Sequence, residues 1–186
     1  MSNNLDYEIN KELGECYLFM GELDKAEQYY QKAAGSNGVH ADPYIGLATI
    51  AVQKGELEKA GTLYEKATKV EANDKAFAGL GLIETEIGSH ERAFGLFEQS
   101  LKVNPANLIA LFGLVQTAYS LGKTEIAVKY LENALEIDPD KVETRFSLAG
   151  CLKSLGRTQE AGKHLEIILE ADPENEAAKE LMAEIS

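Results

Sequence analysis

Five glycines recur along the 186-residue chain at spacings of 34, 33, 34 and 34 residues. An alanine stands five positions after each of them, so the recurrence has two elements in register. The glycines are Gly21, Gly55, Gly88, Gly122 and Gly156, and the alanines are Ala26, Ala60, Ala93, Ala127 and Ala161. A repeat of this length indicates one supersecondary unit that buries its apolar face by stacking on copies of itself.

Each recurring residue type has a physical reason for its position. Glycine adopts the left-handed conformation that ends a helix, and alanine lets two antiparallel helices approach closely. A bulky residue four positions after each alanine would fill the gap between them. These residues are Tyr30, Tyr64, Phe97, Leu131 and Leu165. Ser89, Thr124 and Thr158 are expected to be N-caps of the second helices. The pattern predicts an all-α fold of stacked antiparallel helix pairs, without strands.

These motifs resemble the tetratricopeptide repeat family over nearly the whole chain. The expected units are 7–40, 41–73, 74–107, 108–141 and 142–175, followed by a capping helix at 176–186. The family's Trp at the fourth position is missing, which makes the first and fifth units the looser ones, with Asn10 and Arg145 there. The resemblance implies an α-α superhelix, or solenoid, whose inner surface is lined by the first helix of each pair.

The resemblance also implies which residues face a ligand on that inner surface. Counting within each unit gives a peptide groove of Lys11, Glu15, Ile45, Thr49, Val52, Leu82, Ile109, Phe112, Gln116, Tyr119 and Phe146. The large apolar members in the fourth and fifth units either anchor a ligand or pack between neighbouring helices. A clamp for a terminal carboxylate, known in the family, is not expected, because Glu15, Gly46 and Gly79 replace the required donors.

The charge balance restricts the partners. With 18 Lys and Arg against 31 Asp and Glu, the formal net charge is −13, which disfavours nucleic acid and anionic membrane surfaces. A neutral or basic protein segment is favoured, and Glu8, Glu12 and Glu15 would steer it. The longest apolar run, 108–115, is too short to insert in a membrane. We expect a cytoplasmic protein; an exported fragment whose leader has been removed is the alternative.

Catalytic chemistry is not indicated by the sequence. Its three histidines have no cysteine or carboxylate at metal-ligand spacing, its paired carboxylates recur at the repeat period as turn and cap residues, no nucleophile has a base beside it, and no cofactor is expected. Cys16 and Cys151 are expected to be buried packing residues, with a redox role as the alternative. The favoured function is therefore a monomeric or weakly oligomeric adaptor that binds a peptide or helix of another protein. The alternative is a structural scaffold that self-associates through an open N-terminal face around the apolar segment 17–20.

Overall fold

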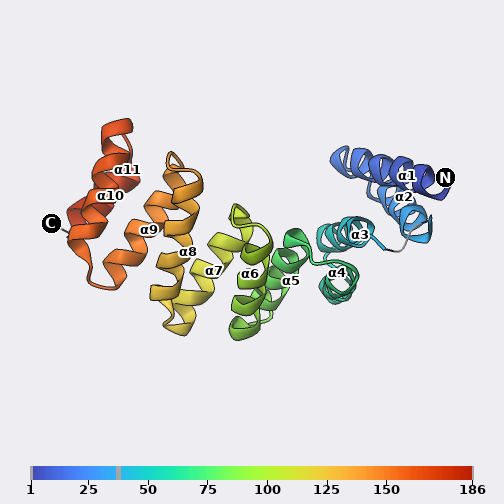
Figure 1. Cartoon of the computed structure of the whole chain (residues 1–186), viewed down its shortest axis with the longest axis horizontal. Helices are drawn as coiled ribbons and strands as arrows, with labels where there is room; N and C mark the ends of the chain where they lie inside the picture. Colours follow the sequence, from blue (N-terminus) through green and yellow to red (C-terminus); the bar gives the residue numbers. More distant parts are fainter. Residues whose placement is uncertain (1, 37–38, 186) are drawn as a thin grey trace. The chain divides into compact units, whose positions relative to one another are not determined.

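The computed structural model describes residues 2–36 and 39–185, and the regular structure in these two ranges is entirely helical (Figure 1). Their eleven helices are α1 (Ser2–Phe19), α2 (Leu23–Ser36), α3 (Asp42–Gln53), α4 (Leu57–Val70), α5 (Asp74–Glu86), α6 (His90–Val103), α7 (Leu108–Leu121), α8 (Thr124–Ile137), α9 (Val142–Ser154), α10 (Thr158–Ala171) and α11 (Glu176–Ile185). The expected fold class, a solenoid of stacked antiparallel helix pairs, is confirmed.

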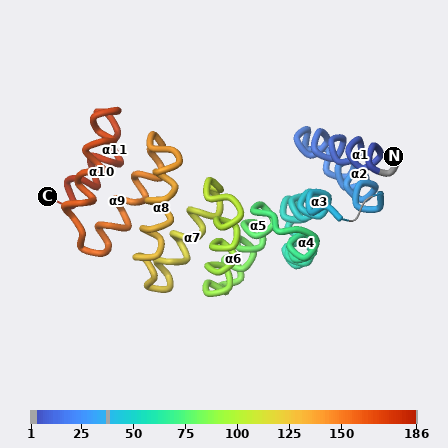
Figure 2. The backbone as a smooth tube through the Cα atoms, in the orientation of Figure 1, coloured from blue at the N-terminus to red at the C-terminus, as the bar shows by residue number. Residues whose placement is uncertain are grey.

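Two compact units make up the chain, 1–110 and 111–186, and each is described by itself. In the first unit, α1 packs on α2, α2 on α3, α3 on α4, α4 on α5, and α5 on α6. In the second unit, α8 packs on α9, α9 on α10, and α10 on α11. Figure 2 shows the chain turning back between successive helices of each unit. Such nearest-neighbour packing is how a repeat array builds its core.

The five recurring glycines occupy the turn inside each helix pair. All have positive φ angles, between 67° and 82°, which a side chain would disfavour. At the α3–α4 turn, the Gly55 N–H donates to the Val52 carbonyl at 3.0 Å, and the Glu56 N–H donates to the Ala51 carbonyl at 2.8 Å. This pair of bonds is a Schellman motif, which satisfies carbonyls left free at the end of the helix.

Rings from the second helices fill gaps that glycines leave in the first helices. The Tyr30 ring of α2 lies where a Cβ would stand at Gly14 and at Gly46, at 2.9 Å and 2.3 Å from the nearest ring atoms. Tyr64 of α4 occupies the same place against Gly79 of α5, with 2.4 Å to the nearest ring atom. These glycines are therefore required by close packing, and the five alanines of the repeat are also fully buried.

The expected N-caps of the second helices are wrong. Ser89 stands at the N-cap position of α6 but accepts no hydrogen bond there, while Thr124 and Thr158 lie one residue inside α8 and α10. The glycine turn leaves a single residue before α8, so the threonine falls in the first helical turn. Side-chain caps occur instead at Asn73, whose Oδ1 accepts from the N–H groups of α5, and at Asn107 and Asn175 before α7 and α11.

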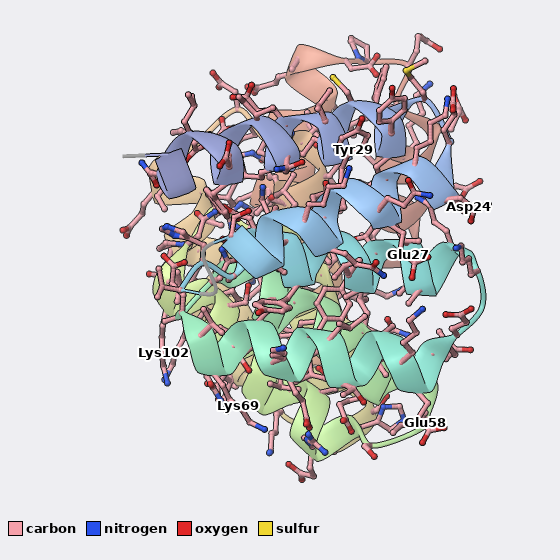
Figure 3. The ribbon with its side chains drawn as sticks, turned by 90° about the vertical axis from the view of Figure 1, so that its right-hand side faces the viewer. Asp24, Glu27, Tyr29, Glu58, Lys69 and Lys102 are labelled. Atoms are coloured by element: carbon pink, nitrogen blue, oxygen red, sulfur yellow. The ribbon has the colours of Figure 1, made fainter. Side chains whose placement is uncertain are left out.

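Ion pairs join successive helix pairs in the first unit. Lys54, which follows α3, contacts Asp24 at 3.1 Å and Glu27 at 2.8 Å, and Figure 3 shows Asp24 and Glu27 on α2. Arg92 of α6 bridges Glu65 of α4 at 2.6 Å and the buried Glu84 of α5 at 3.1 Å. Exposed pairs of this kind contribute little each, so the buried alanines and rings dominate the stability.

One cysteine does not lie where the sequence predicts it. Cys151 in α9 is fully buried, as expected, but Cys16 in α1 is exposed. The expectation for Cys16 is wrong because it lies on a face of α1 that no other described helix covers. Phe19 and Met20 at the end of α1 are also open, with 95% and 64% of their surface exposed.

Candidate peptide-binding surface on the first helices

The eleven predicted groove residues lie on α1, α3, α5, α7 and α9, and their exposure differs. Those that are exposed are Glu15, Val52, Leu82, Ile109, Gln116 and Tyr119. Those that are half-buried are Lys11, Ile45, Thr49, Phe112 and Phe146. The assignment of all eleven to one ligand groove stays a prediction. The structure brings Val52 and Leu82 together in the first unit.

In the first unit, Val52 and Leu82 line an apolar pocket of about 270 Å³ between α3, α4 and α5. Both side chains are partly open to solvent, at 41% and 47% exposure, so they stand at the mouth of the pocket. The rest of its lining is Leu57, Tyr64, Gly79, Ile83 and Glu86. A pocket of this size, open on one side, is suited to one side chain of a bound segment.

The shape of the pocket follows from Gly79 and Tyr64. Because Gly79 has no side chain, the Tyr64 ring of α4 can pass over α5 and form part of the pocket wall. The Thr49 hydroxyl donates to the Ile45 carbonyl at 2.9 Å, so its oxygen accepts from the Tyr64 hydroxyl at 3.4 Å. The phenol is thereby held between α3 and α5, and the pocket is formed before any ligand arrives.

Carboxylates gather beside this pocket and on α1. Glu86 lines the pocket itself, and its side chain is exposed. Burial, with the nearby charges of Glu15 and Asp42, raises the pKa of Tyr30 to about 12. Burial and the charges of Asp42 and Glu8 also raise the pKa of Tyr7 far above its usual value. Burial is the main cause of both shifts, and the carboxylates of Glu8, Glu15 and Asp42 add to it as negative charges on α1 and α3.

In the second unit, Tyr119 is the best-defined of the predicted residues. It lies on α7 with 45% of its surface exposed, and its hydroxyl hydrogen bonds to Cys151 and Ser154 of α9. Burial, followed by the contact with Cys151, raises the pKa of Tyr119 to about 12, while the contact with Ser154 acts in the opposite direction. The side chain thus has a packed, hydrogen-bonded end and an open edge, and its role as a ligand anchor stays a prediction.

A larger hollow, of about 500 Å³, lies over the α1–α2 turn. Its lining is Gly21, Glu22, Leu23, Asp24, Lys25 and Lys54. The charges in it already neutralise each other, because Lys54 contacts Asp24 and Lys25 contacts Glu22. Because its charges are paired and its lining is less apolar, this hollow is a weaker candidate than the pocket between α3 and α5.

Among residues 2–36 and 39–185, no three His, Cys, Asp or Glu side chains are grouped so that they could ligate a metal ion. None of their helices combines the length and the apolar composition that a membrane crossing requires.

A family model of the tetratricopeptide repeat matches residues 20–81 and 118–185, which is more than half of the chain. The chain belongs to the tetratricopeptide repeat family. Membership accounts for the five turn glycines and for the fully buried alanines that follow them.

The curated relatives of this tetratricopeptide repeat chain are longer proteins. One is the BBSome complex member BBS4 of Bos taurus, 33% identical over 119 residues, which are 62% of this chain and 23% of that protein. Another is the CTR9 homolog of Arabidopsis thaliana, 30% identical over 107 residues, covering 55% of this chain and 10% of that protein. The chain thus spans less than a quarter of the length of either relative.

Solved structures share the fold of this tetratricopeptide repeat chain. PilF of Pseudomonas aeruginosa superposes with a TM-score of 0.77 at 17% identity, covering 100% of this chain and 90% of PilF. YrrB, described as a repeat protein with an unusual peptide-binding site, superposes with a TM-score of 0.71 at 19% identity, covering 92% of this chain and 89% of YrrB. At these identities the likeness shows the fold alone.

Sequence reasoning missed most of the pocket wall. Leu57, Tyr64, Gly79, Ile83 and Glu86 were not assigned to the groove. A signal was present, since Gly46 and Gly79 stand at the same place in consecutive units, where each could admit a ring from the preceding helix. A small residue repeated at one position of the first helices therefore marks where a ring of a second helix reaches toward the inner surface.

Proposed function

We propose that the chain is a protein-binding scaffold that holds a segment of another protein along its first helices. One apolar side chain of that segment enters the pocket between α3 and α5. The observation that carries this proposal is the preformed pocket of about 270 Å³ at whose mouth Val52 and Leu82 stay exposed. Exposed apolar residues around a concavity are typical of a binding site.

The carboxylates near the pocket predict a second property of the bound segment, which is a positive charge. Glu86 lies in the pocket lining, and Glu15 and Asp42 contribute a negative potential on the helices before it. A Lys or Arg next to the apolar anchor would therefore be attracted, while an acidic segment would be repelled. The recognised chemistry is an apolar residue flanked by basic ones, in a short extended or helical segment.

The contribution of the anchoring side chain to the binding free energy follows from its burial. Placing a Leu-sized side chain in an apolar pocket contributes about 1.5–3 kcal/mol. Removing that contribution weakens binding roughly tenfold or more, since about 1.4 kcal/mol corresponds to a factor of ten. The remaining affinity would come from charge and from contacts along the other first helices.

The test uses peptides selected from a phage-displayed random dodecapeptide library against the intact chain. Selected peptides should share an apolar residue beside Lys or Arg, and Leu82→Asp should weaken their binding about tenfold or more in fluorescence anisotropy. Val103→Asp is the matched control, because Val103 is exposed to a similar degree, at 46%, but lies at the end of α6, outside the pocket lining. Circular dichroism checks that both variants keep their helices.

Equal affinity of the wild type and Leu82→Asp for the selected peptides would reject the pocket. Equal weakening by Leu82→Asp and Val103→Asp would reject it as well, because the effect would then come from the added negative charge alone.

A further inference from the structure

Helix α1 carries an apolar stripe with one acidic residue in it. Leu5, Ile9, Glu12, Cys16 and Phe19 follow one another at spacings of three or four residues and are all exposed. This spacing places them on one side of the helix, which we call the outer face of α1. Exposure reaches 63% for Leu5, 47% for Ile9 and 95% for Phe19.

The middle of this face is buried in the next first helix, whereas the positions one repeat after Leu5 and Phe19, which are Val39 and Gln53, are exposed. Pro43, Gly46 and Ile50 of α3 stand one repeat after Ile9, Glu12 and Cys16, and all three are buried. Ile50 packs with Ala26 and Tyr30 of α2, so on α3 this face receives the second helix of the preceding pair.

Helix α1 packs on α2 and α3 through its other side. Tyr7 is 2% exposed and stacks on His40 with 4.8 Å between ring centroids, and Gly14 lies against the Tyr30 ring. In Figure 1, α1 lies at the end of the first unit, beside α2. Among the described residues, the outer face is left without a covering helix.

Glu12 determines what can cover this face. At the equivalent Gly46, the Tyr30 ring stands 2.3 Å from where a Cβ would be, so a second helix bearing that ring cannot pack on Glu12 as α2 packs on α3. The sequence prediction placed Glu12 with Glu8 and Glu15 as a charge that steers a ligand into the groove. The structure also places it in the apolar stripe, between Ile9 and Cys16, where a partner that covered the face would have to offer it a cation.

We propose that the outer face of α1 docks a basic amphipathic helix of another protein. Aliphatic side chains of that helix would cover Leu5, Ile9 and Phe19, and a Lys or Arg between them would meet Glu12. Charge complementarity selects this occupant, because the neighbouring Glu15 is exposed on the same helix and adds to the negative potential.

A second copy of the chain is disfavoured by the same charges. Two outer faces packed together would oppose one Glu12 to another. A head-to-tail copy would meet α11, whose charged residues are three glutamates, Glu176, Glu180 and Glu184, and one lysine, Lys179. Like charges placed opposite one another in an interface suppress that pairing.

Cys16 gives a direct readout of occupancy, because it lies within the face and is exposed, whereas Cys151 is buried. The probes are two synthetic amphipathic helices with the same leucine stripe, one with lysines and one with glutamates on its polar side. Iodoacetamide labelling of the intact chain is followed by mass spectrometry. The lysine peptide should slow Cys16 labelling about tenfold near saturation, since ~90% occupancy leaves a tenth of the sites open, and the glutamate peptide should not.

Charge reversal on the face provides the decisive variant. Glu12→Lys should exchange the preference, so that the glutamate peptide now protects Cys16 and the lysine peptide does not. Glu58→Lys is the matched control, because Glu58 is exposed on α4, away from α1 (Figure 3), and its variant should keep the original preference. Leu82→Asp should also keep it, which separates this face from the pocket of the proposed function.

Three results would overturn the proposal. The first is equal protection, or none, from the two peptides on the wild-type chain. The second is an unchanged preference in Glu12→Lys, which would assign the effect to the net charge of −13. The third is protection of Cys16 that grows with protein concentration in the absence of peptide, which would identify a second copy as the occupant.

Discussion

Cys16 and Cys151 stand at the same place in the first and the fifth helix pair, yet their surroundings are opposite. Cys151 is fully buried in α9, while Cys16 is exposed on α1. The residues at this place in the pairs between them, Ile50, Ile83 and Thr117, are buried too. Burial at this position is therefore decided by whether a preceding helix packs on it, and the residue type plays little part.

The largest expected difference in the free energy of unfolding is between the variants Ile50→Asp and Cys16→Asp. Ile50 is 1% exposed against Ala26 and Tyr30, so the buried carboxylate and the lost packing should lower the free energy of unfolding by about 4 kcal/mol or more. Cys16→Asp should change it by less than about 0.5 kcal/mol. Urea denaturation followed by circular dichroism measures both, and similar losses would contradict the contrast between the two helices.

Thiol chemistry should separate Cys16 and Cys151 in the wild-type chain. Burial raises the pKa of the Cys151 thiol and shields it from reagents, so this residue reacts only when the second unit opens locally. Without any peptide present, iodoacetamide should label Cys16 at least about a hundredfold faster than Cys151, as expected for opening that costs about 3 kcal/mol or more. Comparable rates in a time course by mass spectrometry would place the two thiols in similar surroundings.

A smaller difference in stability is expected between the variants Gly46→Ala and Glu12→Ala, which change equivalent positions of α3 and α1. The new methyl at position 46 would overlap the Tyr30 ring, so the variant should lose about 1–3 kcal/mol. Glu12→Ala, on an open face, should change stability by less than about 0.5 kcal/mol. The melting temperature reports both, and Gly46→Ala combined with Tyr30→Leu should recover part of the loss if the ring causes it.

The smallest expected effect is that of Phe19→Ser. Phe19 is 95% exposed at the end of α1, so its loss should leave the free energy of unfolding within about 0.5 kcal/mol of the wild type. Chemical denaturation measures this change. A loss of 2 kcal/mol, of the order that a buried apolar side chain gives, would mean that the outer face of α1 is covered in the isolated chain.

The sequence was sufficient for the features that depend on local backbone geometry. Gly55 and its four equivalents ended helices where the repeat predicted it, because a positive φ is a requirement of the turn itself. The N-cap predictions were wrong for a local reason as well, because Thr124 lies inside α8. Asparagines before the first helices supply the capping side-chain oxygens instead.

The candidate site was predicted only in part, because its wall comes from three helices. Val52 and Leu82 follow from counting positions along the repeat, but Tyr64 was interpreted as a core residue of α4. Its ring is largely buried and also lines the pocket, a double role that depends on the missing Cβ of Gly79 in the next helix. The predicted burial of Cys16 was wrong because the repeat pattern does not reveal which first helix has no other helix packed on its outer face.

The contact between the Tyr30 ring and Gly46 has a consequence for rearranging this protein by genetic engineering. Behind a module that carries a tyrosine at the place of Tyr30, the next module must present glycine where the ring arrives, whereas behind Leu131 the fifth unit carries Ser147 there. The first module carries Glu12 at this place and Tyr30 as its own ring. A second copy placed directly behind it would set Glu12 against Tyr30, so the tandem duplication would not fold into a continuous array. Modules that begin at Ala41 or Asp74 carry Gly46 and Gly79 and can be shuffled, which sets a directional rule for building longer or shorter versions.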